Sequence, residues 1–331
     1  MLQNVRYSAL ASTWSPHYDR FLTSDERYKP TPVELIHLAA GVEGLSGVEL
    51  MHPGHVHPDN LTQIRAALDE TGLKISSIQA SISSSPQYRA GSLTSDDPQV
   101  RHLAIQTAKT AMDLSAELGC ERINLWLGRD GFDYPFQIDY DLAWGRMVQA
   151  VGEIATHRPE IKIGIEYKIK EPRNWLLAST ASKAILLAME SGQANVGVLL
   201  DTGHALWAYE NMAEVVSLLA RSGRLVHIHF NDNTRLWDDD LIVGSIHFLE
   251  IMEMLFWLDR TGYEGWFTFD PHPTLDDPSK GVQVSMRYIN GMLKVMEGVG
   301  VDAIEKAIAS RQVTEVMALV AEQLFRNHPD R

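Results

Sequence analysis

In the stretch VGVLLDTGH, residues 196–204, an apolar run typical of a buried strand ends at an acidic residue, Asp201. The same organisation recurs in IGIEYK (163–168), HIHFND (227–232) and FTFDPH (267–272). Short runs rich in branched and aromatic residues alternate along the chain with stretches of helical spacing. This alternation predicts repeated βα units.

Eight strands are predicted, at about residues 5–11, 47–51, 74–81, 122–128, 161–168, 196–201, 224–231 and 266–270. Eight βα units predict an α/β fold, a (β/α)8 TIM barrel over about residues 5–298. Stretches 301–311 and 314–327 predict additional C-terminal helices, a helical extension over about residues 299–331. One barrel with extensions accounts for the chain, so a single domain over residues 1–331 is expected.

Several predicted helices carry recognisable start signals. Thr31 is followed by Pro32, and Asp97 by Pro98, which is the arrangement of an N-cap and a first-turn proline. Further helices are predicted at about residues 182–190, 212–222, 247–260 and 282–297. Residues 81–95 and 129–141 are predicted to be long loops after the third and fourth strands, on the face where such barrels build their active sites.

The charge and the cysteine content narrow the classes of partner. A net charge of −14 would repel a nucleic-acid backbone or an anionic membrane surface, so neither is expected as a partner. No apolar run approaches the roughly 20 residues that span a bilayer. With Cys120 as the single cysteine and no signal pattern in MLQNVRYSAL, no disulfide framework and a cytoplasmic location are expected.

The last four predicted strands each end in a hard metal ligand: Glu166, Asp201, His229 and Asp270. Any one of these acids alone is equally well explained as a helix cap or an ion-pair partner. Together, four ionisable groups at the ends of apolar strands require a shared cation or an extended network. Carboxylate and imidazole ligands suit Mn²⁺, our first choice, and also Mg²⁺, Co²⁺ or Zn²⁺.

Other side chains near these strand ends carry alternative interpretations. His204, Asp238 and Asp240 are candidates for a second metal site, although a solvated acidic cluster explains the aspartates equally well. Lys168 either polarises a substrate carbonyl or forms a salt bridge to Glu166, Asp201 or Glu171. Trp126, with Trp14 and Trp207, is a candidate wall for a sugar ring, or plain core. We expect His227 to point away from the ligand face, and the tract of His52, His55 and His57 to line the rim.

IGIEYKIKEP, VLLDTGHA, HIHFNDNTRLWDDD and FTFDPHP resemble the xylose-isomerase-like TIM-barrel superfamily, which includes sugar isomerases, ketose 3-epimerases and the endonuclease IV branch. Within it, these motifs look most like L-rhamnose isomerases, apart from Tyr167, where those enzymes carry a histidine. The resemblance implies a principal metal on Glu166, Asp201, His229 and Asp270 and a second on His204, Asp238 and Asp240. By the same resemblance Lys168 matches a substrate-contacting lysine. The candidate catalytic residues are therefore Glu166, Lys168, His204 and Asp270, and the candidate substrate contacts are Trp126, Lys168, His204 and Trp14.

A second resemblance involves YDRFLTSDERYKPT, VEGLSGVEL and GRDGFDYPFQIDY, which are similar to segments of catalytic subunits of C-glycoside deglycosidases. That resemblance implies a single Mn²⁺, a 3-oxo-C-glycoside substrate and a small partner subunit. The endonuclease branch is disfavoured, because it uses more histidines at strand ends and because a charge of −14 is poorly matched to DNA.

The expected function is therefore a divalent-metal-dependent sugar isomerase or epimerase that acts on an aldose or ketose. It would work through an enediolate or a metal-assisted hydride shift. The alternatives are a deglycosidase catalytic subunit and, more remotely, a non-catalytic sugar-binding barrel. The expected partner is a small sugar or glycoside, without phosphate because no glycine-rich phosphate loop is present, and a homo-oligomer is expected.

Overall fold

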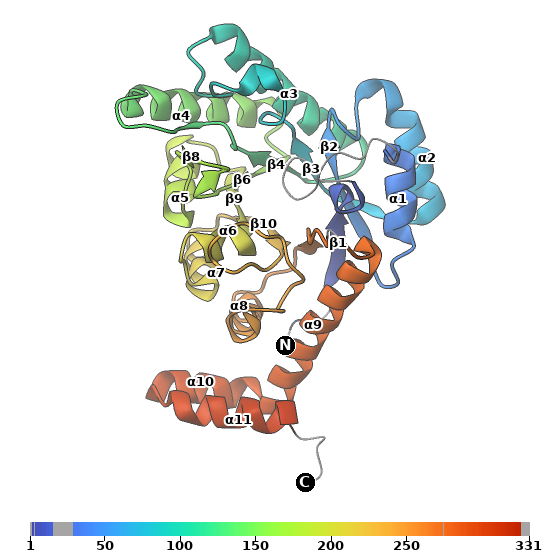
Figure 1. The fold of residues 1–331 in the computed structure, drawn as a ribbon, viewed down its shortest axis with the longest axis vertical. Helices are drawn as coiled ribbons and strands as arrows, with labels where there is room; N and C mark the ends of the chain where they lie inside the picture. The colour runs from blue at the N-terminus through green and yellow to red at the C-terminus, as the bar shows by residue number, and fades with distance from the viewer. Residues whose placement is uncertain (1, 3, 16–28, 274, 326–331) are drawn as a thin grey trace.

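The computed structural model describes residues 2, 4–15, 29–273 and 275–325. Eight parallel strands close a barrel in the order β1-β11-β10-β9-β6-β4-β3-β2 (Figure 1). They are β1 (Arg6–Leu10), β2 (Gly47–His52), β3 (Lys74–Ala80), β4 (Arg122–Trp126), β6 (Lys162–Glu166), β9 (Val196–Asp201), β10 (Leu225–Phe230) and β11 (Trp266–Phe269). The predicted (β/α)8 barrel and the positions of its eight strands are confirmed.

Eight helices follow or precede the barrel strands and surround them (Figure 1). They are α1 (Pro32–Ala40), α2 (Leu61–Thr71), α3 (Pro98–Glu117), α4 (Tyr140–His157), α5 (Ala181–Glu190), α7 (Met212–Arg221), α8 (Phe248–Arg260) and α9 (Pro278–Val299). Thr31 and Asp97 cap α1 and α3 as predicted, since their side chains accept hydrogen bonds from the backbone N–H groups of Glu34 and Gln99. Three short 3-10 helices lie at Ala11–Trp14, Pro58–Asn60 and Pro86–Tyr88.

Two features at the carboxyl ends of the strands were not predicted. A six-residue helix, α6 (Thr202–Trp207), begins directly after β9. The loops after β4 and β6 form a small antiparallel sheet of β5 (Gly131–Phe132), β8 (Asn174–Leu176) and β7 (Lys170–Glu171), in that order. This sheet fixes the chain that leaves β6, and so determines where the residues after Glu166 lie.

Polar side chains occupy part of the barrel interior. Ser8 on β1 bonds to Thr268 on β11, and Thr268 bonds to His227 on β10. Glu49 on β2 bonds to His227, although β1 and β11 separate β2 from β10 in the barrel order. Because a contact between strands that are not neighbours must cross the interior, these side chains lie inside the barrel. Apolar side chains from the strands and the helices form the core around the outside of the sheet.

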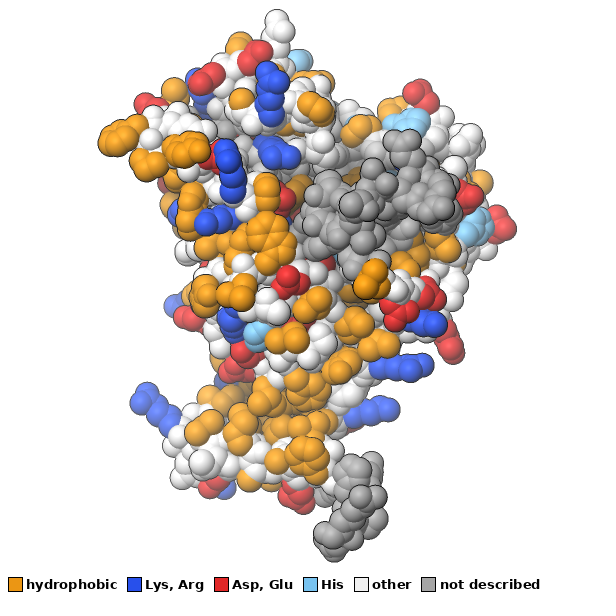
Figure 2. Space-filling model, viewed as in Figure 1, with side chains coloured by type: hydrophobic (Ala, Val, Ile, Leu, Met, Phe, Trp, Pro, Cys, Tyr) orange, Lys and Arg blue, Asp and Glu red, His pale blue; other side chains and the backbone are white. Residues whose placement is uncertain are grey.

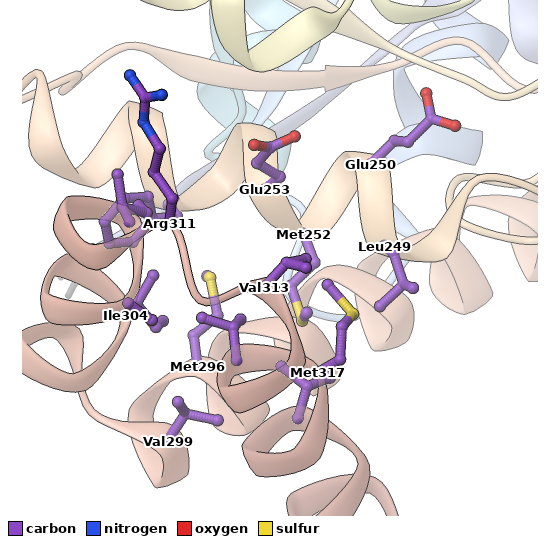
Figure 3. A pocket seen from close by; sticks show the side chains of 15 residues that line it. Leu249, Glu250, Met252, Glu253, Met296, Val299, Ile304, Arg311, Val313 and Met317 are labelled. Carbon is purple, nitrogen blue, oxygen red and sulfur yellow. The ribbon is translucent and has the colours of Figure 1, made fainter.

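The last two helices, α10 (Val301–Ser310) and α11 (Val313–Phe325), pack against each other and against α9 at the end farthest from the barrel (Figure 1). The predicted C-terminal helices are therefore confirmed. An apolar cavity of about 480 Å³ lies between α8, α9 and this pair, lined by side chains that include Met252, Met296 and Met317 (Figure 3). Figure 2 shows hydrophobic side chains gathered over these C-terminal helices. Among the described residues, no helix combines the length and the apolar character needed to cross a bilayer.

Candidate metal centre

The four predicted ligands come together around one histidine nitrogen. Nδ1 of His229 lies 3.8 Å from Oε1 of Glu166, 3.9 Å from Oδ2 of Asp201 and 3.9 Å from Oδ2 of Asp270. Glu166 and Asp201 end β6 and β9, His229 lies near the end of β10, and Asp270 follows β11. These four strands are consecutive in the barrel, so parallel pairing brings their carboxyl ends to one place.

The spacing of these atoms suits a shared ion better than hydrogen bonds. Distances of 3.8–3.9 Å are too long for hydrogen bonding. They lie below the roughly 4.2 Å that separates two ligand atoms on opposite sides of an ion about 2.1 Å from each, so one ion can contact both atoms of each pair. The His229 side chain is 1% exposed and its Nδ1 has no hydrogen-bond partner among the described residues, a costly arrangement that an ion would relieve. One nitrogen and three carboxylates therefore fit a divalent cation such as Mn²⁺.

The pKa shifts of the clustered side chains also favour a bound cation. Burial raises the pKa of Asp270 well above its usual range, and the nearby charge of Asp201 raises it further. Burial also raises the pKa of Asp201, with contributions from Asp238 and Glu166. For His229, burial opposes protonation, but the Glu49 and Glu166 carboxylates outweigh it and raise its pKa well above the usual value. Without an ion, protons must offset this negative charge, and a divalent cation would replace them.

The sequence left open whether Asp201 caps a helix or binds a metal, and its two carboxylate oxygens suit both roles. Its Oδ1 accepts a hydrogen bond of 2.8 Å from the backbone N–H of His204 and so caps α6. Its Oδ2 faces Nδ1 of His229. The helix-cap interpretation is therefore confirmed for this residue without excluding a ligand role, because each interpretation uses a different oxygen.

Two asparagines that the sequence reasoning missed hold the carboxylates. Nδ2 of Asn231 donates to Asp270 Oδ1 at 2.9 Å and to Asp201 Oδ2 at 3.2 Å. Nδ2 of Asn124 donates to Glu166 Oε2 at 2.6 Å. The available signals were an amide within the apolar strand RINLW and another two residues after His229, where an extended chain repeats the same face.

The sequence also offered no expectation for Glu49, which contacts His229. The expectation that His227 points away from the ligand face was wrong. Residues 227 and 229 are two apart on a strand, so their side chains leave the same face, and both point into the barrel. Their Nε2 atoms lie 3.2 and 3.1 Å from the same Oε2 of Glu49. Burial lowers the pKa of His227 to about 4 despite this carboxylate. A charged residue within the apolar run GVEL was the signal for Glu49.

A cavity of about 390 Å³ opens next to the cluster, within the range of small-molecule sites. Its lining consists of Leu10, Ser12, Ser15, Met51, Gln79, Ser83, Ser84, Trp126, Arg129, Glu166, Lys168, Glu171, His204, Asp238, Asp240, Asp270 and His272. Among the four ligand candidates, Glu166 and Asp270 belong to this lining. Asp201 and His229 are each 1% exposed and lie beneath it.

Lys168 lies in the cavity wall and is nearly fully buried. Its Nζ lies 2.7 Å from Oδ2 of Asp238 and also pairs with Glu171, so the predicted salt bridge to Glu171 is present. The same ammonium group lies 5.6 Å from the ring centre of Trp126 and 5.9 Å from that of Trp207. These aromatic rings and carboxylates hold the lysine beside Glu166.

The candidates for a second metal are only partly brought together. Nε2 of His204 lies 3.4 Å from Oδ2 of Asp238, whereas Oδ2 of Asp240 lies 3.5 Å from Nδ1 of His272. Within the described part of the chain, three groups of residues are close enough to share an ion: Glu166 with Asp201 and His204, Asp201 with His229 and Asp270, and Glu49 with His227 and His229. His204, Asp238 and Asp240 do not form such a group, whereas Glu166, Asp201, His229 and Asp270 are divided between the first two groups, which share Asp201.

The remaining candidates lie apart from the cavity. Trp14 is 6% exposed, its indole N–H donates to Ser279 Oγ at 2.9 Å, and it is absent from the cavity lining. His52 and His55 bond to the backbone of Val56 and Met51 in the turn after β2. Of the segment YDRFLTSDERYKPT, residues 18–28 lie outside the described residues.

Comparisons with known proteins agree with the barrel fold. A family model described as xylose isomerase-like TIM barrel matches residues 37–292. A xylose isomerase from Thermus thermophilus is 28% identical over 309 residues, which cover 89% of this chain and 78% of that enzyme. A D-tagatose 3-epimerase-like protein of known structure covers 88% of this chain and 98% of its own, with a TM-score of 0.69 at 19% identity. A D-psicose 3-epimerase from Clostridium cellulolyticum H10 covers 87% and 99%, with a TM-score of 0.68 at 16% identity.

Proposed function

This chain belongs to the xylose isomerase-like TIM barrel family, and from that premise we propose that it is a divalent-metal-dependent sugar isomerase or epimerase. The observation that carries the proposal is the buried Nδ1 of His229, which faces three carboxylates at 3.8–3.9 Å and, within the described part of the chain, has no hydrogen-bond partner. Glu166, Asp201, His229 and Asp270 would hold the ion, with Mn²⁺ as the first choice. When bound, the ion supplies a Lewis acid that polarises a sugar carbonyl and acidifies the neighbouring C–H bond.

Glu166 and Asp270 are the proposed proton carriers. Both carboxylates belong to the principal cluster and both line the cavity, so their oxygens are within reach of a bound sugar. One of them would remove the proton next to the carbonyl to give an enediolate, and a proton returned to a different carbon or a different face completes the reaction. Asn124 and Asn231 orient these two carboxylates through the hydrogen bonds described above.

The charge of the cavity favours an uncharged substrate. Among the described residues, five carboxylates line it, from Glu166, Glu171, Asp238, Asp240 and Asp270, against the two cationic side chains Lys168 and Arg129. Two of these carboxylates, those of Glu171 and Asp238, pair with Lys168 itself. Even with the proposed divalent ion bound, the charges around the cavity roughly cancel, so the site offers a phosphate group no excess of positive charge, and we propose a free sugar or glycoside. Lys168 and His204 would bind its oxygens, and Trp126 would pack against its ring.

We further propose one metal per chain and proton transfer rather than a hydride shift. A hydride shift between two metals would require His204, Asp238 and Asp240 to hold a second ion. In the structure the Lys168 ammonium lies 2.7 Å from Asp238, so a positive charge already accompanies the carboxylate that a second ion would need. Repulsion between that ammonium group and a second cation would weaken binding there.

The test is to strip the protein of metal, reload it with Mn²⁺, and measure both metal content and chemistry. We expect about one Mn²⁺ per chain, with NMR showing deuterium exchange from solvent into one member of a panel of aldoses and ketoses. Glu166→Gln and Asp201→Asn should each weaken Mn²⁺ binding at least about 100-fold and remove exchange, because each takes away a negatively charged ligand. Asp59→Asn is the control, since that side chain is 96% exposed.

The outcomes separate the candidate functions. Stoichiometric metal in both Glu166→Gln and Asp201→Asn would overturn the site. Two Mn²⁺ per chain with aldose–ketose interconversion and no solvent deuterium would replace proton transfer by a hydride shift. Release of an aglycone from 3-oxo-C-glycosides, without exchange into free sugars, would identify a deglycosidase instead.

A further inference from the structure

Glu49 is a buried carboxylate in the middle of an apolar strand, and neither the proposed ligand set nor the proposed proton transfer uses it. It lies on β2, which does not adjoin any of the strands that supply the four ligands. Its side chain is 1% exposed. A buried charge in a strand interior needs partners, and the partners of Glu49 lie on the other side of the barrel.

The contacts of Glu49 converge on the histidine of the metal centre. Oε2 of Glu49 lies 3.1 Å from Nε2 of His229 and 3.2 Å from Nε2 of His227. Asn124 donates to Oε1 of Glu49 at 3.4 Å while it also donates to Glu166. One carboxylate therefore contacts a histidine ligand directly and is joined to a second ligand, Glu166, through a single asparagine.

The hydrogen bond to Glu49 determines which nitrogen of His229 can bind an ion. A carboxylate accepts hydrogen bonds, so the ring nitrogen that faces Glu49 must carry a hydrogen. That nitrogen is Nε2, and the other nitrogen, Nδ1, is the one that faces Glu166, Asp201 and Asp270. A histidine ligand that donates its second N–H to a carboxylate is fixed in orientation and is a stronger donor to the metal.

We propose that Glu49 is a positioning residue that sets the orientation and the metal affinity of His229 from inside the barrel. This inference rests on the metal centre proposed above. Glu49 does not line the cavity, and its contact with His229 is the hydrogen bond to Nε2, not to the nitrogen that faces the three carboxylates.

Glu49 belongs to a set of hydrogen-bonded side chains inside the barrel. His227 binds the same oxygen of Glu49, and its Nε2 also lies 3.0 Å from Oγ1 of Thr268. Thr268 in turn bonds to Ser8 at 2.6 Å. These residues belong to β1, β2, β10 and β11, so their side-chain hydrogen bonds connect four strands inside the barrel, including the strand that carries Glu49 and the strand that carries His229.

The experiment compares Glu49→Gln, Glu49→Leu and Thr268→Val in the full chain. Mn²⁺ dissociation constants are measured by electron paramagnetic resonance titration, and thermal denaturation of the metal-free proteins reports damage to the fold. We expect Glu49→Leu to weaken Mn²⁺ binding about 10- to 100-fold and Glu49→Gln, which keeps an acceptor oxygen, to weaken it less than about 10-fold. Thr268→Val, in the same buried layer but bonded to His227 rather than His229, should stay within about 2-fold.

A spectroscopic readout separates positioning from general loss of structure. With Co²⁺ in place of Mn²⁺, the visible absorption bands of Glu49→Leu should shift, while those of Glu49→Gln and Thr268→Val should match the unmodified protein. If Glu49→Leu does not fold, the comparison of Glu49→Gln with Thr268→Val still decides, because only the former should weaken Mn²⁺ binding by more than about 2-fold.

The possible failures are distinguishable. Unmodified protein that binds Mn²⁺, together with equal affinity in Glu49→Gln, Thr268→Val and any folded Glu49→Leu, would overturn the role of Glu49 and leave the metal centre standing. An equal loss of affinity in Glu49→Gln and Thr268→Val would also overturn it, because the effect would then follow the packing of the layer. Failure of the unmodified protein to bind Mn²⁺ would overturn the metal centre and this inference together.

Discussion

Lys168 shows how one side chain is constrained by its neighbours at the residue scale. Its side chain is 2% exposed, and the carboxylates it pairs with, from Glu171 and Asp238, are 12% and 2% exposed. An ammonium group at this depth is costly unless opposite charges accompany it, and two carboxylates left without it would be costly as well. The salt bridge and the proposed contact with a substrate oxygen are therefore compatible roles, because the bridge is what keeps the ammonium group beside the cavity.

We predict that Lys168→Met lowers the free energy of unfolding by about 3–5 kcal/mol, since it removes the buried ammonium group that pairs with Glu171 and Asp238. Urea denaturation of the metal-free protein measures this loss. Turnover should also fall at least about 100-fold if the lysine assists the proton transfer. Lys109→Met is the matched control, because Lys109 pairs with Glu153 at 2.7 Å near the surface and should cost about 1 kcal/mol or less. Equal losses in the two variants would contradict the argument.

The end of β10 shows how one element organises the chain that follows it. The backbone of Asp232 bonds to that of Leu241 in both directions, at 2.7 and 3.0 Å, and so closes the loop that contains Asp238 and Asp240. The side chain of Asp232 accepts hydrogen bonds of 2.9 Å from the N–H groups of Ile246 and His247 at the start of α8. A single strand end therefore positions both a wall of the cavity and the next helix.

Replacing this aspartate should cost more than replacing an ordinary helix cap. We predict that Asp232→Ala lowers the free energy of unfolding by about 2–3 kcal/mol, because several buried donors lose their acceptor at once. Asn211→Ala is the comparison, since Asn211 caps the exposed start of α7 through one bond to the N–H of Glu214 and should cost about 1 kcal/mol. Denaturant titration of both variants decides, and a smaller loss for Asp232→Ala would be inconsistent with its role.

At the scale of the whole molecule, a cluster of ionisable groups lies where four strands end side by side. The chain carries a net charge of −14, and three carboxylates of the proposed centre lie within 3.9 Å of one histidine nitrogen. Mutual repulsion there opposes barrel closure unless protons or a cation neutralise it. An ion bound by Glu166, Asp201, His229 and Asp270 would tie β6, β9, β10 and β11 together, so its effect should extend to the stability of the barrel.

We predict that Mn²⁺ at about 100 times its dissociation constant stabilises the protein by about 2.7 kcal/mol. For 331 residues, an unfolding entropy of about 2.1 cal/mol/K per residue converts this into a rise of about 4 °C in Tm. Differential scanning calorimetry with and without Mn²⁺ measures the shift. The Tm of Asp201→Asn should rise much less at the same Mn²⁺ concentration. A shift of equal size in both proteins would mean that the ion acts elsewhere.

The sequence by itself determined the barrel and the principal cluster. Eight apolar runs alternate with stretches whose apolar residues recur at helical spacing, and few folds other than a (β/α)8 barrel have this pattern. Parallel strands bring their carboxyl ends to one face. Four hard ligands at the ends of consecutive strands were therefore expected to meet, and Glu166, Asp201, His229 and Asp270 do so because barrel order follows chain order. Local signals were also sufficient for the caps at Thr31 and Asp97, which depend only on residues within one turn.

Only the tertiary structure decided which polar residues from distant strands support that cluster. Glu49 reaches His229 across the barrel, 180 positions away in the chain, and no local pattern encodes a contact of that kind. The pairing of Lys168 with Asp238 likewise depends on how the loops after β6 and β10 pack. Periodicity determines which face a side chain leaves, but its partner is determined by the closure of the barrel and the packing of the loops, which are properties of the whole chain.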